Sequence, residues 1–247
     1  MNIVTKPVEY KDGDQNCIGF LAWDETYADP KPCVLINHAW SGLDGFAQDQ
    51  AVQMAALGYV GFALDNYGDG ALPESVDEKM ALMGPLKDDR AKLLKRLKAG
   101  MKAAAKLEQV DETHMAAIGY CFGGLCTLDM ARAGLDLKAA VSFHGLLDAA
   151  EGSKPKKIKA KVLAAHGWDD PMVTPDQVKA FCEEMAASKC ADWQLHAYGN
   201  TTHAFTVPDA NDKKNGLQYN ALSAQRAMLA SQDILQEVFG MHGAVVG

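Results

Sequence analysis

Short apolar runs alternate with longer stretches of helical periodicity along most of the chain. The apolar runs predict strands at 33–36, 59–64, 115–119, 139–143, 162–165 and 193–198. The stretches between them predict helices at 46–57, 86–108, 123–133, 175–188 and 217–239. Residues 1–22 are typical of two antiparallel edge strands that turn at Asp12-Gly13-Asp14.

Strands that alternate with helices are typical of a mostly parallel sheet with helices on both faces. We therefore expect an α/β fold with a central sheet of about eight strands. Neither an internal repeat nor an interdomain linker is visible, so residues 1–247 are expected to form a single domain. The lysine-rich helix at 86–108 is expected to present a solvated basic face, with docking of an acidic partner as the alternative.

Composition and charge narrow the possible functions. The chain has 247 residues, of which 48% are apolar and 23% charged, as in soluble globular proteins and unlike disordered ones. Its net charge of −8 argues against nucleic-acid binding, which requires neutralisation of phosphates. The sequence lacks an apolar run long enough to cross a membrane and the apolar core of a secretory signal. Six cysteines without metal-ligand spacing predict reduced thiols, no metal or other cofactor, and a cytoplasmic location.

The strongest chemical motif is Gly119-Tyr120-Cys121-Phe122-Gly123-Gly124. It lies between a predicted strand and a predicted helix, and it has the Gly-x-nucleophile-x-Gly form of a nucleophile elbow. Such a turn holds its central residue above the sheet at a helix N-terminus, where the helix dipole favours a thiolate. A buried cysteine beside a glycine turn is the alternative. The strand–turn–helix context favours Cys121 as a nucleophile.

Two partners for Cys121 follow in the chain order nucleophile, acid, histidine. Asp170 comes just after the strand at 162–165 and is the candidate acid, with Asp169 as the alternative. His203 lies on the loop after the next strand and is the candidate base. Taken singly, an Asp-Asp-Pro sequence is typical of a turn and a loop histidine is usually incidental. The three residues together, each on a strand-end loop, indicate nucleophilic acyl chemistry.

The elbow, the segment His166–Pro171 and His203-Ala204-Phe205 resemble the dienelactone hydrolase family of α/β-hydrolases over nearly the whole chain. The resemblance implies the α/β-hydrolase fold. It also implies a catalytic triad in which Cys121 attacks, His203 serves as base and acid, and Asp170 orients the imidazole.

An oxyanion hole with two backbone donors should accompany this triad. One is the amide of Phe122, which follows the nucleophile, and the other, by family position, is the amide of Trp40. His38 is expected to bond the backbone of the same loop rather than to act in catalysis. We expect a mobile loop at 65–70 over this end of the sheet, and a substrate cleft lined by Ala39, Tyr67 and Phe205.

Two positions depart from the family. Dienelactone hydrolases carry a glutamate where this chain has Ala39, and an arginine three residues after the histidine, where this chain has Thr206. A carboxylate that enters a dry pocket needs a cation or several donors. We therefore expect a preference for neutral acyl groups over dianionic dienelactones. His144 follows a predicted strand and is a further candidate to line the pocket.

The sequence thus predicts a hydrolase of a small-molecule ester or lactone that works through a thioester at Cys121, with no nucleic-acid or membrane partner. A non-catalytic binding or regulatory protein on the same scaffold is one alternative, since fold does not fix function. An acyltransferase or thioesterase is another. The physiological substrate and the oligomeric state are left open by the sequence.

Overall fold

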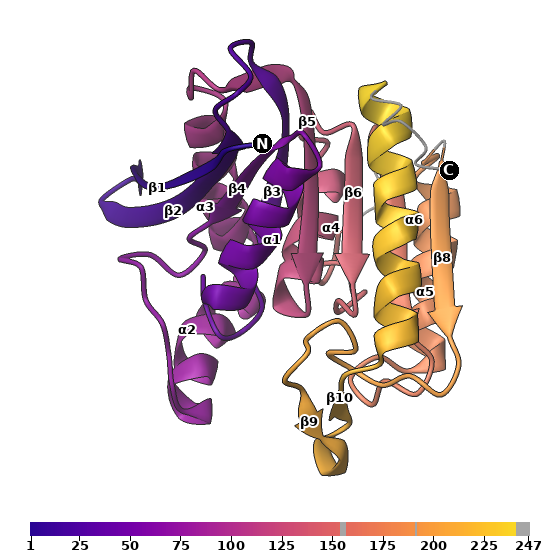
Figure 1. Cartoon of the computed structure of the whole chain (residues 1–247). Coiled ribbons are helices and arrows are strands. Elements are labelled where there is room, and N and C mark those ends of the chain that lie inside the picture. The colour runs from indigo at the N-terminus through magenta and orange to yellow at the C-terminus, as the bar shows by residue number, and fades with distance from the viewer. Residues whose placement is uncertain (154–156, 191, 241–247) are drawn as a thin grey trace.

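An eight-stranded sheet with helices on both faces forms the centre of the protein (Figure 1). The computed structural model describes residues 1–153, 157–190 and 192–240. The strands are β1 (Ile3–Asp12), β2 (Gln15–Asp24), β3 (Lys31–Asn37), β4 (Val60–Leu64), β5 (Val110–Tyr120), β6 (Ala139–Phe143), β7 (Lys161–Gly167) and β8 (Trp193–Tyr198). They are arranged in the order β1-β2-β4-β3-β5-β6-β7-β8, antiparallel at the β1–β2–β4 edge and parallel from β4 to β8. The predicted fold class is confirmed.

Two apolar layers hold the helices on the sheet, because successive strand residues face opposite sides. Ile36 of β3 packs with α1 (Gly45–Ala56) and α6 (Ala221–Phe239) on one face. Leu35, its neighbour in sequence, packs with α3 (Arg90–Ala104), α4 (Phe122–Arg132) and α5 (Pro175–Ala187) on the other. None of the helices in the described ranges combines the length and apolarity needed to cross a bilayer.

The helix predicted at 86–108 is two helices, α2 (Val76–Asp88) and α3, so the prediction was wrong in this part of the chain. Asp89 leaves the helical conformation at φ −103° and ψ 85°, and its side chain accepts a hydrogen bond from the Lys92 amide as the cap of α3. The lysines continue at helical spacing across this break, which hides it from periodicity. A signal for α2 was present, since Ser75 and Glu78 form a capping box at its start.

The segment 65–70 is tied to the protein rather than free, contrary to the expected mobile loop. The Asp65 carboxylate accepts hydrogen bonds from the amides of Gly68, Gly70 and Ile18 at 2.7 to 2.9 Å. Asp65, Asn66 and Tyr67 are buried. The segment forms a fixed wall next to the strand ends instead of a lid.

The last helix begins at Ala221 rather than at residue 217, because two short strands precede it. These strands, β9 (Asn211–Asp212) and β10 (Leu217–Gln218), pair with each other, and Asn220 caps α6. In Figure 1 this hairpin and α2 lie beyond the carboxyl ends of the parallel strands. In α/β proteins that end of the sheet is where ligands bind.

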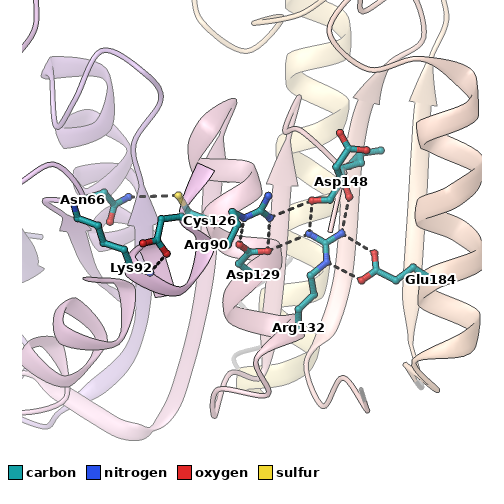
Figure 2. Close-up of polar contacts among 10 residues, drawn as sticks. Asn66, Arg90, Lys92, Cys126, Asp129, Arg132, Asp148 and Glu184 are labelled. Atoms are coloured by element: carbon teal, nitrogen blue, oxygen red, sulfur yellow. Dashed lines mark hydrogen bonds and ion pairs between the residues drawn. The ribbon is translucent and has the colours of Figure 1, made fainter. Parts of the chain in front are cut away.

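Two arginines join three helices to the loop that follows β6 (Figure 2). Arg90 of α3 holds the Asp129 carboxylate of α4 through two hydrogen bonds of 2.5 and 2.6 Å. Arg132 of α4 holds the Glu184 carboxylate of α5 through bonds of 2.9 and 2.7 Å. Arg132 also donates to the carbonyls of Leu147 and Asp148. Both guanidinium groups are largely buried, so this arginine cluster fixes the loop against α3, α4 and α5.

Replacement of Arg132 by methionine should lower the free energy of unfolding by about 2 to 3 kcal/mol, because the largely buried Glu184 carboxylate and the Leu147 carbonyl lose their donor. Urea denaturation measures this value. Lys179→Met is the control, because Lys179 forms an exposed pair with Glu183 on the same helix as Glu184 and should contribute at most about 0.5 kcal/mol. Equal losses in the two variants would contradict the role assigned to Arg132.

Candidate active site

Cys121 occupies the tight turn between β5 and α4, at φ 54° and ψ −116°. A positive φ is unfavourable for a residue with a Cβ atom, and such strain is typical of functional turns. The Cys121 amide donates to the Phe143 carbonyl at 3.0 Å, which ties the turn to the neighbouring strand β6. The half-buried thiol is thereby held at the N-terminus of α4.

Two glycines allow α4 to approach the sheet closely enough to form this turn. A Cβ atom at Gly119 would lie 2.0 Å from the Gly123 carbonyl oxygen, and one at Gly123 would lie 2.0 Å from the Asn37 carbonyl oxygen. Both contacts are with backbone atoms, which cannot rotate away. The Gly-x-Cys-x-Gly spacing is therefore a steric requirement of the turn.

His203 and Asp170 form a buried hydrogen-bonded pair. Asp170 Oδ2 accepts from His203 Nδ1 at 2.7 Å, with side chains 0% and 2% exposed. Asp170 Oδ1 accepts from the Met172 amide at 2.8 Å, which fixes the carboxylate. Asp169, the alternative acid, is exposed, and its amide donates to the Thr201 carbonyl. The structure thus pairs His203 with Asp170.

The other imidazole nitrogen of His203, Nε2, has no hydrogen-bond partner of standard geometry among the described residues. Burial alone lowers the pKa of His203, but charge interaction with Cys121, hydrogen bonding to Asp170 and Cys121, and the charge of Asp170 outweigh burial and raise this pKa to about 10. Cys121 therefore acts on the pKa of His203 through charge and through a hydrogen-bonding contact that is looser than standard geometry. Catalytic hydrogen bonds are often loose before substrate binds.

A cavity of about 610 Å³ contains both Cys121 and His203 in its lining. The loop Ala39–Ser41 and the α2 residues Met80 and Met83 form one part of its wall. Residues of the β9–β10 hairpin form another. Its volume is within the usual range of small-molecule sites.

Of the residues expected to line this cavity, Ala39 does so, and Tyr67 and Phe205 do not. Phe205 is fully buried and packs edge-on against His144 and Tyr198. Tyr67 is 7% exposed and donates its hydroxyl to the Trp40 carbonyl at 2.9 Å. Neither aromatic ring therefore faces the cavity. Each instead contacts a residue that does: Tyr67 contacts Trp40, and Phe205 contacts His144.

Within the part of the chain that the structure describes, neither of the two backbone amides expected to hold the oxyanion donates a hydrogen bond. Trp40 lines the cavity, and its amide donates to no group of the described residues. Phe122 is the first residue of α4, where an amide has no partner within the helix. His38 is buried and donates from Nδ1 to the Ala39 carbonyl, which agrees with its expected bond to the loop backbone.

A second histidine, His144, lies beside His203 with their ring centroids 5.1 Å apart. It lines the cavity, as its position after β6 suggested, and its Nε2 is 2.8 Å from the hydroxyl of Thr206. Burial and the charge of His203 lower the pKa of His144 well below its ordinary value. The sequence gives no sign of this contact, since the two residues are 62 positions apart.

Three carboxylates, those of Asp44, Asp209 and Asp212, also line the cavity. Arg90 is bound to Asp129 in the arginine cluster and does not line the cavity. Among the described residues, no group of three or more histidine, cysteine or acidic side chains is arranged to hold a metal ion.

Comparison with known proteins assigns the chain to a family. The sequence profile of the dienelactone hydrolase family matches residues 19–239. The crystal structure of the dienelactone hydrolase-like promiscuous phosphotriesterase P91, from metagenomic libraries, is 35% identical with a TM-score of 0.92, over 97% of this chain and 100% of that one.

Two further relatives agree. An uncharacterized Caenorhabditis elegans protein, K02A2.1, is 36% identical over 155 residues, which cover 62% of this chain and 98% of the relative. A Bradyrhizobium protein named as a probable 2-oxo-3-(5-oxofuran-2-ylidene)propanoate lactonase is 26% identical over 70% of this chain and 73% of its own length. Because the family profile spans most of the residues and a homologous structure superposes on nearly all of them, the chain belongs to the dienelactone hydrolase family and is a hydrolase.

Proposed function

We propose that the chain hydrolyses small neutral esters or lactones with Cys121 as nucleophile, His203 as base and acid, and Asp170 as the group that orients His203. The observation that carries this proposal is the hydrogen bond from His203 to the buried Asp170, in a cavity that also contains the strained Cys121. A nucleophile, a base and a group that orients the base are what acyl transfer requires.

In the first half of the reaction, the Cys121 sulfur bonds to the carbonyl carbon and the carbonyl oxygen becomes an alkoxide. The amides of Trp40 and Phe122 would donate to this alkoxide. The alkoxide then re-forms the carbonyl, and the carbon–oxygen bond to the alcohol breaks. The departing alcohol oxygen takes a proton from the His203 imidazolium, which leaves a thioester on Cys121 and a neutral imidazole.

In the second half, water attacks the thioester. Cys121 carries no charge while acylated, so the charge that held the pKa of His203 near 10 is absent and the imidazole can accept a proton from water. The tetrahedral intermediate collapses to a carboxylic acid and expels the Cys121 thiolate. The thiolate and the imidazolium are thereby restored together.

Neutral substrates fit the charges that surround the cavity. Asp44, Asp209 and Asp212 would repel a carboxylate on the acyl group, and the family's arginine position holds Thr206, whose hydroxyl is bound to His144. Phosphotriesters are a second candidate class, because they are also neutral and because the similar protein P91 is named as a promiscuous phosphotriesterase.

Alanine in place of Cys121 should lower kcat for p-nitrophenyl butyrate by at least about 10³, since loss of a triad nucleophile removes the covalent route. Iodoacetamide at neutral pH, followed by peptide mapping, should label Cys121 first in the wild type. Cys182→Ala is the control, because Cys182 is also a half-buried free thiol. Full activity in Cys121→Ala, or preferential labelling of Cys182, would refute the assignment.

The ratio of kcat/KM between p-nitrophenyl butyrate and the p-nitrophenyl monoester of succinic acid should be at least about 10 in favour of butyrate, a difference of about 1.4 kcal/mol in transition-state binding. The two acyl groups are similar in size and differ by one carboxylate. A tenfold preference for the anionic ester would reveal a cation at the site. Lys79, whose Nζ lies 5.3 Å from the ring centroid of Trp40, would then be the first residue to replace.

The rate of acylation should depend on pH through His203. Because the pKa of His203 is raised to about 10, its proton is present below that pH and is lost above it. Above about pH 10, kcat/KM for ethyl butyrate should therefore fall, since the ethoxide must be protonated as it leaves. For p-nitrophenyl butyrate the fall should be absent, because p-nitrophenolate leaves without a proton. Identical alkaline limbs for the two esters would contradict the role of His203 as acid.

A further inference from the structure

Both peptide carbonyls that flank the Cα atom of Trp40 are held from within the protein. His38 Nδ1 lies 2.6 Å from the Ala39 carbonyl oxygen. The Tyr67 hydroxyl donates to the Trp40 carbonyl oxygen at 2.9 Å. The Gly42 amide also donates to the Ala39 carbonyl, at a longer 3.2 Å, and no hydrogen bond within the described residues involves the Trp40 N–H group. His38 and Tyr67, with the Gly42 amide, therefore fix the orientation of both peptide planes at Trp40.

Because the peptide bond is planar, fixing the Ala39 carbonyl also fixes the direction of the Trp40 N–H group. The Ala39 carbonyl and the Trp40 amide belong to one peptide unit, and in a trans peptide they point in opposite directions. The described residues contain no cis peptide bond. When His38 holds the Ala39 carbonyl on the protein side, the Trp40 N–H is directed away from that side. Trp40 itself lines the cavity that contains Cys121.

The hydrogen bonds of His38 define which of its nitrogens carries the proton. Its Nε2 accepts from the Asn66 amide at 3.2 Å, so the proton is on Nδ1, the atom that donates to Ala39. His38 is 1% exposed, and burial lowers its pKa, which keeps the ring neutral. The Asn66 carbonyl is in turn held by Arg96 Nη1 at 3.0 Å. The His38 Nδ1–H group therefore donates to the Ala39 carbonyl, and the position of its ring is fixed.

Tyr67 connects this loop to the other expected oxyanion donor. Its ring stacks on that of Phe122 at a centroid distance of 6.1 Å and an interplanar angle of 20°. Its edge-on contact with the His38 ring has a centroid distance of 4.7 Å. One side chain therefore packs against the start of α4, against His38 and, through its hydroxyl, against Trp40.

We infer that His38 and Tyr67 are positioning residues that direct the Trp40 amide at the alkoxide formed from the substrate carbonyl. The inference rests on the proposed function, because it requires acyl chemistry at Cys121. Neither side chain needs to touch the substrate. Each acts by preventing rotation of a peptide plane that carries, or adjoins, an oxyanion donor.

Tyr67→Phe removes the hydroxyl and keeps the ring contacts, so kcat for p-nitrophenyl butyrate should fall about tenfold with KM unchanged within twofold, less than the loss of a whole donor. His38→Leu should lower kcat for the same ester by a similar or larger factor. His38→Asn should recover part of this loss, because the amide nitrogen of asparagine lies near the position of Nδ1 and can donate to Ala39. Tyr59→Phe, in the apolar layer on the opposite face of the sheet from Tyr67, and His114→Asn, in the half-exposed first part of β5 beside Asp111, are the matched controls and should keep wild-type kcat.

Alkylation of Cys121 by iodoacetamide separates a positioning role from a general structural one, because this reaction needs the thiolate but forms no oxyanion. Its second-order rate constant should stay within twofold of the wild type in Tyr67→Phe and His38→Leu. Wild-type kcat in both variants, or an alkylation rate that falls in parallel with kcat, would overturn the inference. A wild-type enzyme that does not hydrolyse the ester, or a Cys121→Ala variant that does, would overturn the proposed function and this inference with it.

Discussion

The close approach of α4 to the sheet is the constraint on which the rest of the site depends. Gly123 lies against the Asn37 backbone at the end of β3, and any side chain there would collide with it. This contact brings three segments together: the turn that holds Cys121, the start of α4 at Phe122, and the loop that follows β3. The thiol, the Phe122 amide proposed as one oxyanion donor and the loop that carries Trp40, the other proposed donor, are therefore positioned by a single packing contact. The arginine cluster then fixes the far end of α4 against its neighbours.

The features that could be predicted from the sequence are those with a local physical cause. Strands β3 to β7 could be predicted because their apolar runs must be buried, and the elbow because its glycines are sterically required. The pairing of Asp170 with His203 follows from chain order, since both residues come at the ends of parallel strands and these ends share one edge of the sheet. The assignment of a family rested on the same residues.

The features that could not be predicted depend on contacts between distant segments. Asp89 ends one helix and caps the next, but it lies in a lysine-rich stretch whose spacing is helical throughout. Tyr67 and Phe205 were expected at the cavity because they are aromatic and near the motifs, yet burial in the layer behind it uses both side chains. The contact of His144 with Thr206 joins two loops that have no relation in the sequence. The periodicity of apolar residues in the sequence indicates whether a residue is buried, but it does not indicate which residues it contacts.

The three carboxylates of the cavity bear on the fate of the product as well as on the choice of substrate. On the proposed mechanism, a neutral ester enters and a carboxylic acid is formed, which ionises at neutral pH. The negative charges of the cavity do not repel the neutral ester, but they repel the carboxylate that is formed from it. Asp44, Asp209 and Asp212 would therefore hasten product release and limit inhibition by accumulated acid.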